Sequence, residues 1–187
     1  MSILVLTSDT LIGTPATGNI EYSGQFYGTD SNASRAQMQR ITQGTAVAST
    51  SGTSIDFVSI LSWVKRITVM FSGVSTNSTS NYLIQLGTGS TTFTTSGYVS
   101  SCRTAVNTSG FLIVDGPTAA SLVSGAITLT NFSGNTWVSS GVLQISGGGA
   151  YYSSGVIALA AQLTAVRITS VTPDTFDAGS INILYEG

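Results

Sequence analysis

The chain has 187 residues, enough for one sizeable domain and an additional segment, and only 7% of them are charged, against about a quarter in an ordinary soluble domain. Its net charge is -2, and because phosphate binding needs clustered lysine and arginine, we expect no nucleic-acid partner. The sequence contains no histidine, which removes the usual general base and the commonest metal ligand, so we expect no catalytic residue, no cofactor and no metal site.

Neutral polar residues take the place of charge. Serine, threonine, glycine and asparagine are abundant, and threonine, like valine and isoleucine, suits a pleated, half-buried surface. The composition therefore predicts an all-β protein. Low charge of both signs also weakens the repulsion between subunits, which favours assembly into an oligomer.

Residues 1–43 are predicted to form a separate arm. The apolar run near the start, Ile3–Leu6, is too short for a membrane span and follows no basic segment, so we expect neither a signal peptide nor membrane insertion. Residues 19–29 indicate two short extended pieces joined at Ser23–Gly24, where glycine permits the positive φ of a tight turn. Ser31–Arg40 is predicted to form one or two helical turns.

The arm carries the residues that we expect to act in assembly. An isolated two-stranded hairpin is marginally stable in water, so its aromatic side chains need a further surface to cover them. Aromatic residues and arginine supply most of the binding energy at protein interfaces. The assembly candidates are Tyr22, Phe26, Tyr27 and Arg35.

Residues 44–187 are predicted to form one β domain of eight or nine strands, because apolar residues alternate with polar ones between turn-forming clusters. In the first clear strand, Ile67, Val69 and Phe71 alternate with more polar positions. The other expected strands are Tyr82–Leu86, Phe111–Val114, Ala126–Thr130, Thr136–Ser139, Val142–Ile145, Val156–Leu159, Val166–Val171 and Ser180–Tyr185. We expect an antiparallel β-sandwich or jelly roll, preceded by the short extended arm.

The only close acidic pair of this domain is Asp174 and Asp177. A glycosidase needs two carboxyl groups that face each other across a sugar. Pro173 fixes φ next to Asp174, whose side chain can accept from nearby backbone N–H groups, so we interpret Asp174 as a turn stabiliser. A calcium site is the remaining alternative, although calcium requires six to eight oxygen ligands.

Several aromatic residues allow both a packing and a contact interpretation. Tyr151 and Tyr152 follow Gly147–Gly149, which we expect to form a hairpin tip and not a phosphate-binding loop, since no Lys-Ser/Thr follows it. Tyrosine on a loop offers a flat apolar face and a hydroxyl to a sugar or a protein. The receptor-contact candidates are Tyr151, Tyr152 and Trp137, and packing in the core is the alternative for each. The single cysteine, Cys102, is expected to be a small buried hydrophobe.

Parts of the sequence resemble a domain found in tail fibre and other tail proteins of bacteriophages and prophages. The resemblance is carried by Gly52–Phe57, Ser62–Phe71 and Asp174–Glu186, and extends over most of residues 44–187. Gly18–Thr29 with Arg35 is similar to the short segment that often precedes such domains. No shaft, coiled coil or collagen-like repeat accompanies these stretches, which favours a short tip, collar or baseplate-attached fibre over a long fibre.

The resemblance implies a structural protein of the virion tail, assembled in the host cytoplasm as a homotrimer. Its arm would join other phage tail or baseplate proteins, and its β domain would face the host and contact a cell-surface glycan or protein. A purely architectural subunit, such as a capsid decoration or tail-junction protein, is the alternative. A depolymerase is a third hypothesis, with Asp174 and Asp177 as its only candidate catalytic pair.

Overall fold

The computed structural model describes residues 10, 13–14, 16–23 and 25–187, which fall into two compact units, Met1–Arg40 and Ile41–Gly187. Throughout this described part the regular elements are strands, and no helix is present. The division lies after Arg40 and not after residue 43, because Ile41–Gln43 forms strand β4, which pairs with the last strand of the larger unit.

The smaller unit contains a three-stranded antiparallel sheet of β1 (Ile20–Tyr22), β2 (Phe26–Thr29) and β3 (Arg35–Gln37). The predicted hairpin is confirmed, whereas the turn residue Gly24 lies outside the described residues. The helical turns predicted for Ser31–Arg40 are wrong. The carboxylate of Asp30 accepts the N–H groups of Asn32 and Ser34, both at 2.9 Å, and thereby forms a tight turn that leads into β3.

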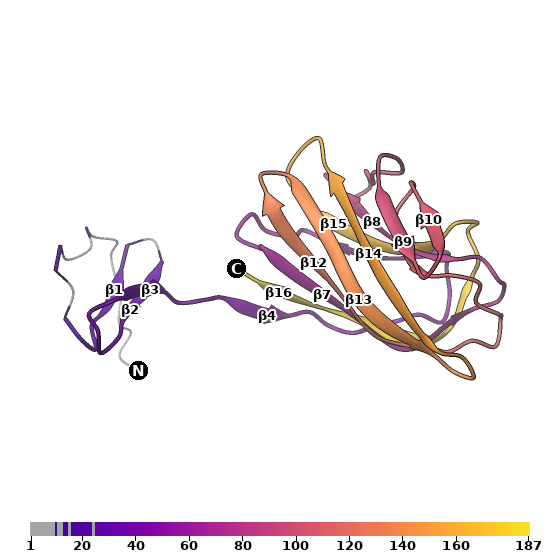
Figure 1. The fold of residues 1–187 in the computed structure, drawn as a ribbon, viewed down its shortest axis with the longest axis horizontal. Helices are drawn as coiled ribbons and strands as arrows, with labels where there is room; N and C mark the ends of the chain where they lie inside the picture. The colour runs from indigo at the N-terminus through magenta and orange to yellow at the C-terminus, as the bar shows by residue number, and fades with distance from the viewer. Residues whose placement is uncertain (1–9, 11–12, 15, 24) are drawn as a thin grey trace. The chain divides into compact units, whose positions relative to one another are not determined.

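The larger unit is a sandwich of two antiparallel sheets, which confirms the predicted all-β sandwich fold (Figure 1). The large sheet contains, in spatial order, β10 (Ala105–Asn107), β9 (Val99–Cys102), β14 (Ala150–Ala158), β13 (Thr136–Ile145), β12 (Val123–Ser133), β7 (Arg66–Thr76), β16 (Phe176–Glu186) and β4, with β5 (Val47–Ala48) also paired to β16. The small sheet contains β11 (Phe111–Val114), β8 (Tyr82–Gly87), β15 (Ala165–Ser170) and β6 (Ser54–Val58).

Two strands that the sequence predicts separately, 136–139 and 142–145, are one continuous strand, β13. Gly141 does not interrupt the ladder: it pairs with Ile127 of β12 on one side and with Ser153 of β14 on the other. A Cβ atom at this position would lie 2.5 Å from the carbonyl oxygen of Ala126, so glycine permits the close approach of β12. A glycine that we interpreted as a break is therefore part of the sheet.

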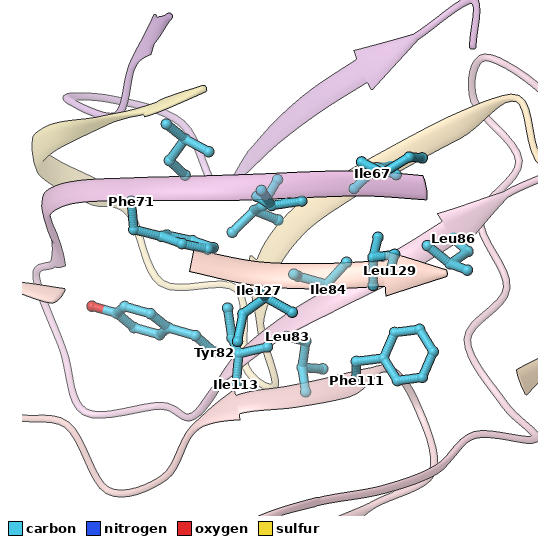
Figure 2. Packing of buried hydrophobic residues seen from close by; sticks show 14 of the residues in the cluster. Ile67, Phe71, Tyr82, Leu83, Ile84, Leu86, Phe111, Ile113, Ile127 and Leu129 are labelled. Atoms are coloured by element: carbon cyan, nitrogen blue, oxygen red, sulfur yellow. The ribbon is translucent and has the colours of Figure 1, made fainter. Parts of the chain in front are cut away.

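The core lies between the two sheets. Ile67, Val69 and Phe71 of β7 all point inward and are buried, as their alternation predicts. Figure 2 shows Ile127 of β12 in the same cluster as Ile84 of β8. Burial of such side chains, at about 25 cal/mol per Å² of apolar surface, is the main driving force for this packing.

Buried hydroxyl groups of the large sheet hold the free edge of β11. The hydroxyl of Ser100 accepts the N–H of Leu112 at 2.8 Å, and the hydroxyl of Ser153 donates to the carbonyl of the same residue at 2.5 Å. The thiol of Cys102 donates to the carbonyl of Ile113 at 3.5 Å, and burial raises its pKa to about 11. The expectation that Cys102 is buried is confirmed. These contacts satisfy backbone groups that an edge strand otherwise leaves unpaired.

Candidate interaction surface

Two of the three receptor-contact candidates, Trp137 and Tyr151, lie in the core and not on the surface. The side chains of Trp137 and Tyr151 are only 4% and 8% exposed, because both point inward from strands and neither lies on a loop. Strand β14 already begins at Ala150, directly after the hairpin tip, so successive residues alternate between the two faces of the sheet. Tyr152 consequently points outward and is 66% exposed. The packing interpretation holds for Trp137 and Tyr151.

The acidic pair has structural partners. Asp174 is buried, and its Oδ2 accepts the backbone N–H of Ser80 at 2.9 Å, which links the β15–β16 connection to the β7–β8 connection. Asp174 thus stabilises a contact between loops that are distant in sequence, in place of the local turn bond that we expected. The carboxylate of Asp177 accepts a hydrogen bond from the hydroxyl of Ser75. Among the described residues, no group of three or more His, Cys, Asp or Glu side chains could hold a metal ion.

The four assembly candidates all lie on the three-stranded sheet of the N-terminal unit. The rings of Tyr22 and Phe26 have their centroids 5.2 Å apart, and Tyr27, the next residue of β2, points to the opposite face of this sheet. The guanidinium of Arg35 forms two contacts with the carboxylate of Glu21, at 2.8 and 3.2 Å, and so joins β3 to β1. Arg35 therefore stabilises its own unit, and its role in assembly stays a prediction.

Exposed apolar side chains of the same unit were missed by the sequence reasoning. Ile20 is 68% exposed, Met38 48% and Phe26 44%, so this unit presents several apolar side chains to solvent. Apolar and polar residues alternate around the hairpin in the sequence. Which face of the sheet each residue occupies, however, depends on its pairing with β2. Met38 donates its backbone N–H to the carbonyl of Phe26 at 2.8 Å.

An uncharged surface lies on the large sheet. No charged residue occurs in the sequence between Asp115 and Arg167, a stretch that includes all of β12, β13 and β14. In Figure 1 these three strands run side by side across one face of the sandwich. The solvent-facing side chains of these strands are therefore all neutral. We call the solvent-facing side of β10, β9, β14, β13 and β12 the neutral face.

Large apolar side chains are exposed on the neutral face. Val99 is 71% exposed, Val106 80%, Val142 53% and Val156 38%. Near its β10 edge, Val99, Val106 and Val156 line an open hollow of about 470 Å³ together with Ser154 and other residues of β9, β10 and β14. Contiguous exposed apolar side chains of this kind mark interaction surfaces on soluble proteins.

No family model, no curated protein and no solved structure matches the chain. Within the described part of the chain, no helix is long and apolar enough to cross a membrane.

Proposed function

We propose that the chain is a structural subunit of a bacteriophage tail that forms a homotrimer. In this proposal the N-terminal unit attaches the protein to other tail or baseplate proteins, and the β-sandwich is displayed toward the host, where it contacts a surface glycan or protein. The proposed location is the virion tail, after assembly in the host cytoplasm. The sequence resemblance in Gly52–Phe57, Ser62–Phe71 and Asp174–Glu186 supports the phage context.

One structural observation carries the assembly role: the neutral face leaves valine and tyrosine side chains exposed on five adjacent strands that contain no charged residue, with Arg103 at its border in the turn between β9 and β10. Soluble monomers seldom expose such a surface, whereas subunits of assemblies cover it. The separate N-terminal unit offers a second apolar surface, with Ile20, Phe26 and Met38 exposed.

A purely architectural subunit is the second candidate function. It is favoured by the burial of Trp137 and Tyr151, which leaves Tyr152 as the one exposed side chain among the three receptor-contact candidates. The depolymerase hypothesis has less support, because Asp174 and Asp177 both accept hydrogen bonds that connect parts of the sandwich. We therefore propose a role without catalysis.

The experiment has two readouts. Gold-labelled antibodies against the purified chain should decorate the tails of phage particles, and decoration of the capsid alone would contradict a tail location. Fluorescent full-length protein should adsorb to cells that the particles infect. Particles that adsorb while the isolated wild-type protein does not would reject the host-contact role and leave the architectural one.

A further inference from the structure

Ion pairs occur on both sheets of the sandwich but outside the neutral face: on the large sheet, Arg66 of β7 is paired with Glu186 of β16. The small sheet carries an ion pair on its outer side, in which Arg167 of β15 donates to Asp56 of β6 at 2.7 and 2.8 Å. The neutral face has no such pair. Its outward residues are Val106 of β10, Val99 and Ser101 of β9, Ala150, Tyr152, Ser154, Val156 and Ala158 of β14, Thr136, Val138, Ser140, Val142 and Gln144 of β13, and Ser124, Ala126, Thr128 and Thr130 of β12.

Strand register arranges these residues in rows across the sheet. Residues that are paired across neighbouring strands form a central row of hydroxyl groups. A row of more apolar residues lies on each side of it. The central row consists of Ser101, Ser154, Ser140, Thr128 and Thr68. The first flanking row begins with Val99, Val156 and Val138 and continues through Thr130 to Arg66, so its apolar part ends at Val138. The second consists of Tyr152, Val142, Ala126 and Met70. The apolar residues therefore form continuous stripes and are not scattered singly.

The size of this surface is sufficient for a stable protein interface. Neighbouring strands lie about 4.8 Å apart and rise about 3.4 Å per residue, so five strands of about ten residues cover roughly 800 Å². Stable interfaces bury about 800 Å² on each partner. The five strands of the neutral face have 37 residues together, which corresponds to roughly 600 Å², and the 11 residues of β7, where the uncharged surface ends at Arg66, bring the area to roughly 800 Å².

We propose that the neutral face is the surface by which copies of this chain pack against one another. The inference rests on the homotrimer proposed above, and it names the surface that the copies bury. If three copies turn this face toward a common axis, each face is covered by its two neighbours. The hydroxyl row and the hollow lined by Val99, Val106 and Val156 then lie inside the assembly.

A further copy of this chain fits the face better than a charged partner. A neutral face offers no opposite charge to a basic or acidic partner, and it brings no like charges together when identical copies meet. Serine and threonine hydroxyl groups rotate and act as donor or acceptor, so a row of them can pair with an identical row. The valine and tyrosine stripes add apolar area, which is the dominant favourable contribution to association.

The test compares Val142→Lys with Val58→Lys in the full-length protein. Val142 is 53% exposed and lies on the neutral face between Ala126 and Tyr152, whereas Val58 is 43% exposed and lies on β6 of the small sheet. Both changes introduce the same charge at an exposed strand position. Mass measurement by sedimentation or light scattering should give a trimer for the wild type and for Val58→Lys, and one third of that mass for Val142→Lys.

The outcomes separate this inference from the homotrimer. A trimeric Val142→Lys protein would overturn the inference and leave the homotrimer in place. A wild type that is monomeric at micromolar concentration would overturn both. A wild-type dimer that only Val142→Lys dissociates would support the face and reject the trimer. Far-ultraviolet circular dichroism with a thermal melt verifies that each variant is folded.

If Val142→Lys fails to fold, thiol labelling gives a second test. Ser140→Cys places a thiol in the hydroxyl row, at an exposed position of the single chain, while the native Cys102 is buried. The assembled protein should react with a maleimide at least tenfold more slowly at residue 140 than the protein dissociated by dilution. Equal rates in the oligomer and the dissociated protein would overturn the inference.

Discussion

The hydroxyl of Tyr98 accepts the backbone N–H of Leu86 at 2.8 Å. Tyr98 directly precedes β9 of the large sheet, and Leu86 lies on β8 of the small sheet, so this bond joins the two layers of the sandwich. Both residues are buried, and burial raises the pKa of the tyrosine hydroxyl to about 12. The ring also meets Phe111 edge-on, with 5.0 Å between the centroids, so packing and hydrogen bonding fix the same side chain.

Tyr98→Phe should keep the ring packing and leave the N–H of Leu86 without its acceptor. The free energy of unfolding is expected to fall by about 1–3 kcal/mol, the cost of an unsatisfied buried donor. Urea denaturation followed by fluorescence measures this change. Tyr152→Phe is the matched control, because Tyr152 is exposed, and it should change the value by less than about 0.5 kcal/mol. Equal effects of the two substitutions would contradict the importance of the bond.

Arg66 and Glu186 should make the stability dependent on pH. Arg66 Nε and Nη2 donate to the two Glu186 oxygens at 2.6 and 2.5 Å, which holds the pKa of that carboxyl below its ordinary value of 4.5. A lowered pKa in the folded state stabilises the fold above the ordinary pKa, and this contribution is lost as the pH falls through the folded value. Arg66→Gln should therefore lower the melting temperature at pH 7, with a smaller difference at pH 3.

The control for this prediction is Lys65→Gln, which removes the same charge from an adjacent exposed residue. Its melting temperature should follow that of the wild type at both pH values. A difference between Arg66→Gln and wild type that is constant from pH 7 to pH 3 would show that titration of Glu186 contributes nothing to stability.

Gly179 marks a bulge in β16, where its register with β7 shifts between Ala178 and Ser180. Its φ is +86°, and a Cβ atom would collide with the backbone of Gly73. Strained backbone alone costs about 1–3 kcal/mol. Gly179→Ala should therefore lower the free energy of unfolding by more than this amount. Gly134 also has a positive φ, +53°, but open space around it, so Gly134→Ala should cost about 1–2 kcal/mol. Equal losses in urea denaturation would show that the approach to Gly73 has no energetic effect.

The all-β fold could be predicted from the sequence because its strands follow a local pattern. Alternation at Ile67, Val69 and Phe71 identifies the buried side of β7 without any tertiary information. Short polar strands gave no such pattern: β9 consists of Val-Ser-Ser-Cys, and its buried Ser100 is explained only by the hydrogen bond to Leu112 of β11. Nothing in the local sequence of β9 indicates that Leu112 is the partner of Ser100.

The interaction surface was harder to predict because it depends on register. Tyr151 and Tyr152 are adjacent in the sequence, yet one is buried and the other exposed, and the difference follows from where β14 begins. Trp137 is buried by the same alternation on β13. The neutral face unites residues of five strands through their pairing, so its stripes exist only once the order of the strands is known.

Deletion of residues 1–40 should leave a folded sandwich, because the chain divides into compact units after Arg40. Residues 41–48 belong to the sandwich: the N–H of Gly44 donates to the carbonyl of Ile183 at 2.7 Å, and β4 and β5 both pair with β16. Deletion of residues 1–48 should therefore remove several backbone hydrogen bonds, each contributing about 0.5–1.5 kcal/mol, and expose the edge of β16.

Thermal unfolding and light scattering distinguish the two deletions. The protein that lacks residues 1–40 should melt cooperatively within a few degrees of the full chain, whereas the protein that lacks residues 1–48 should melt lower and aggregate, because β16 is then an unpaired edge strand. Loss of cooperative melting in the shorter deletion would show that the N-terminal unit stabilises the sandwich. Attachment is tested separately: particles assembled with the shorter deletion should lack the protein, since the proposed attachment residues Tyr22, Phe26, Tyr27 and Arg35 are then absent.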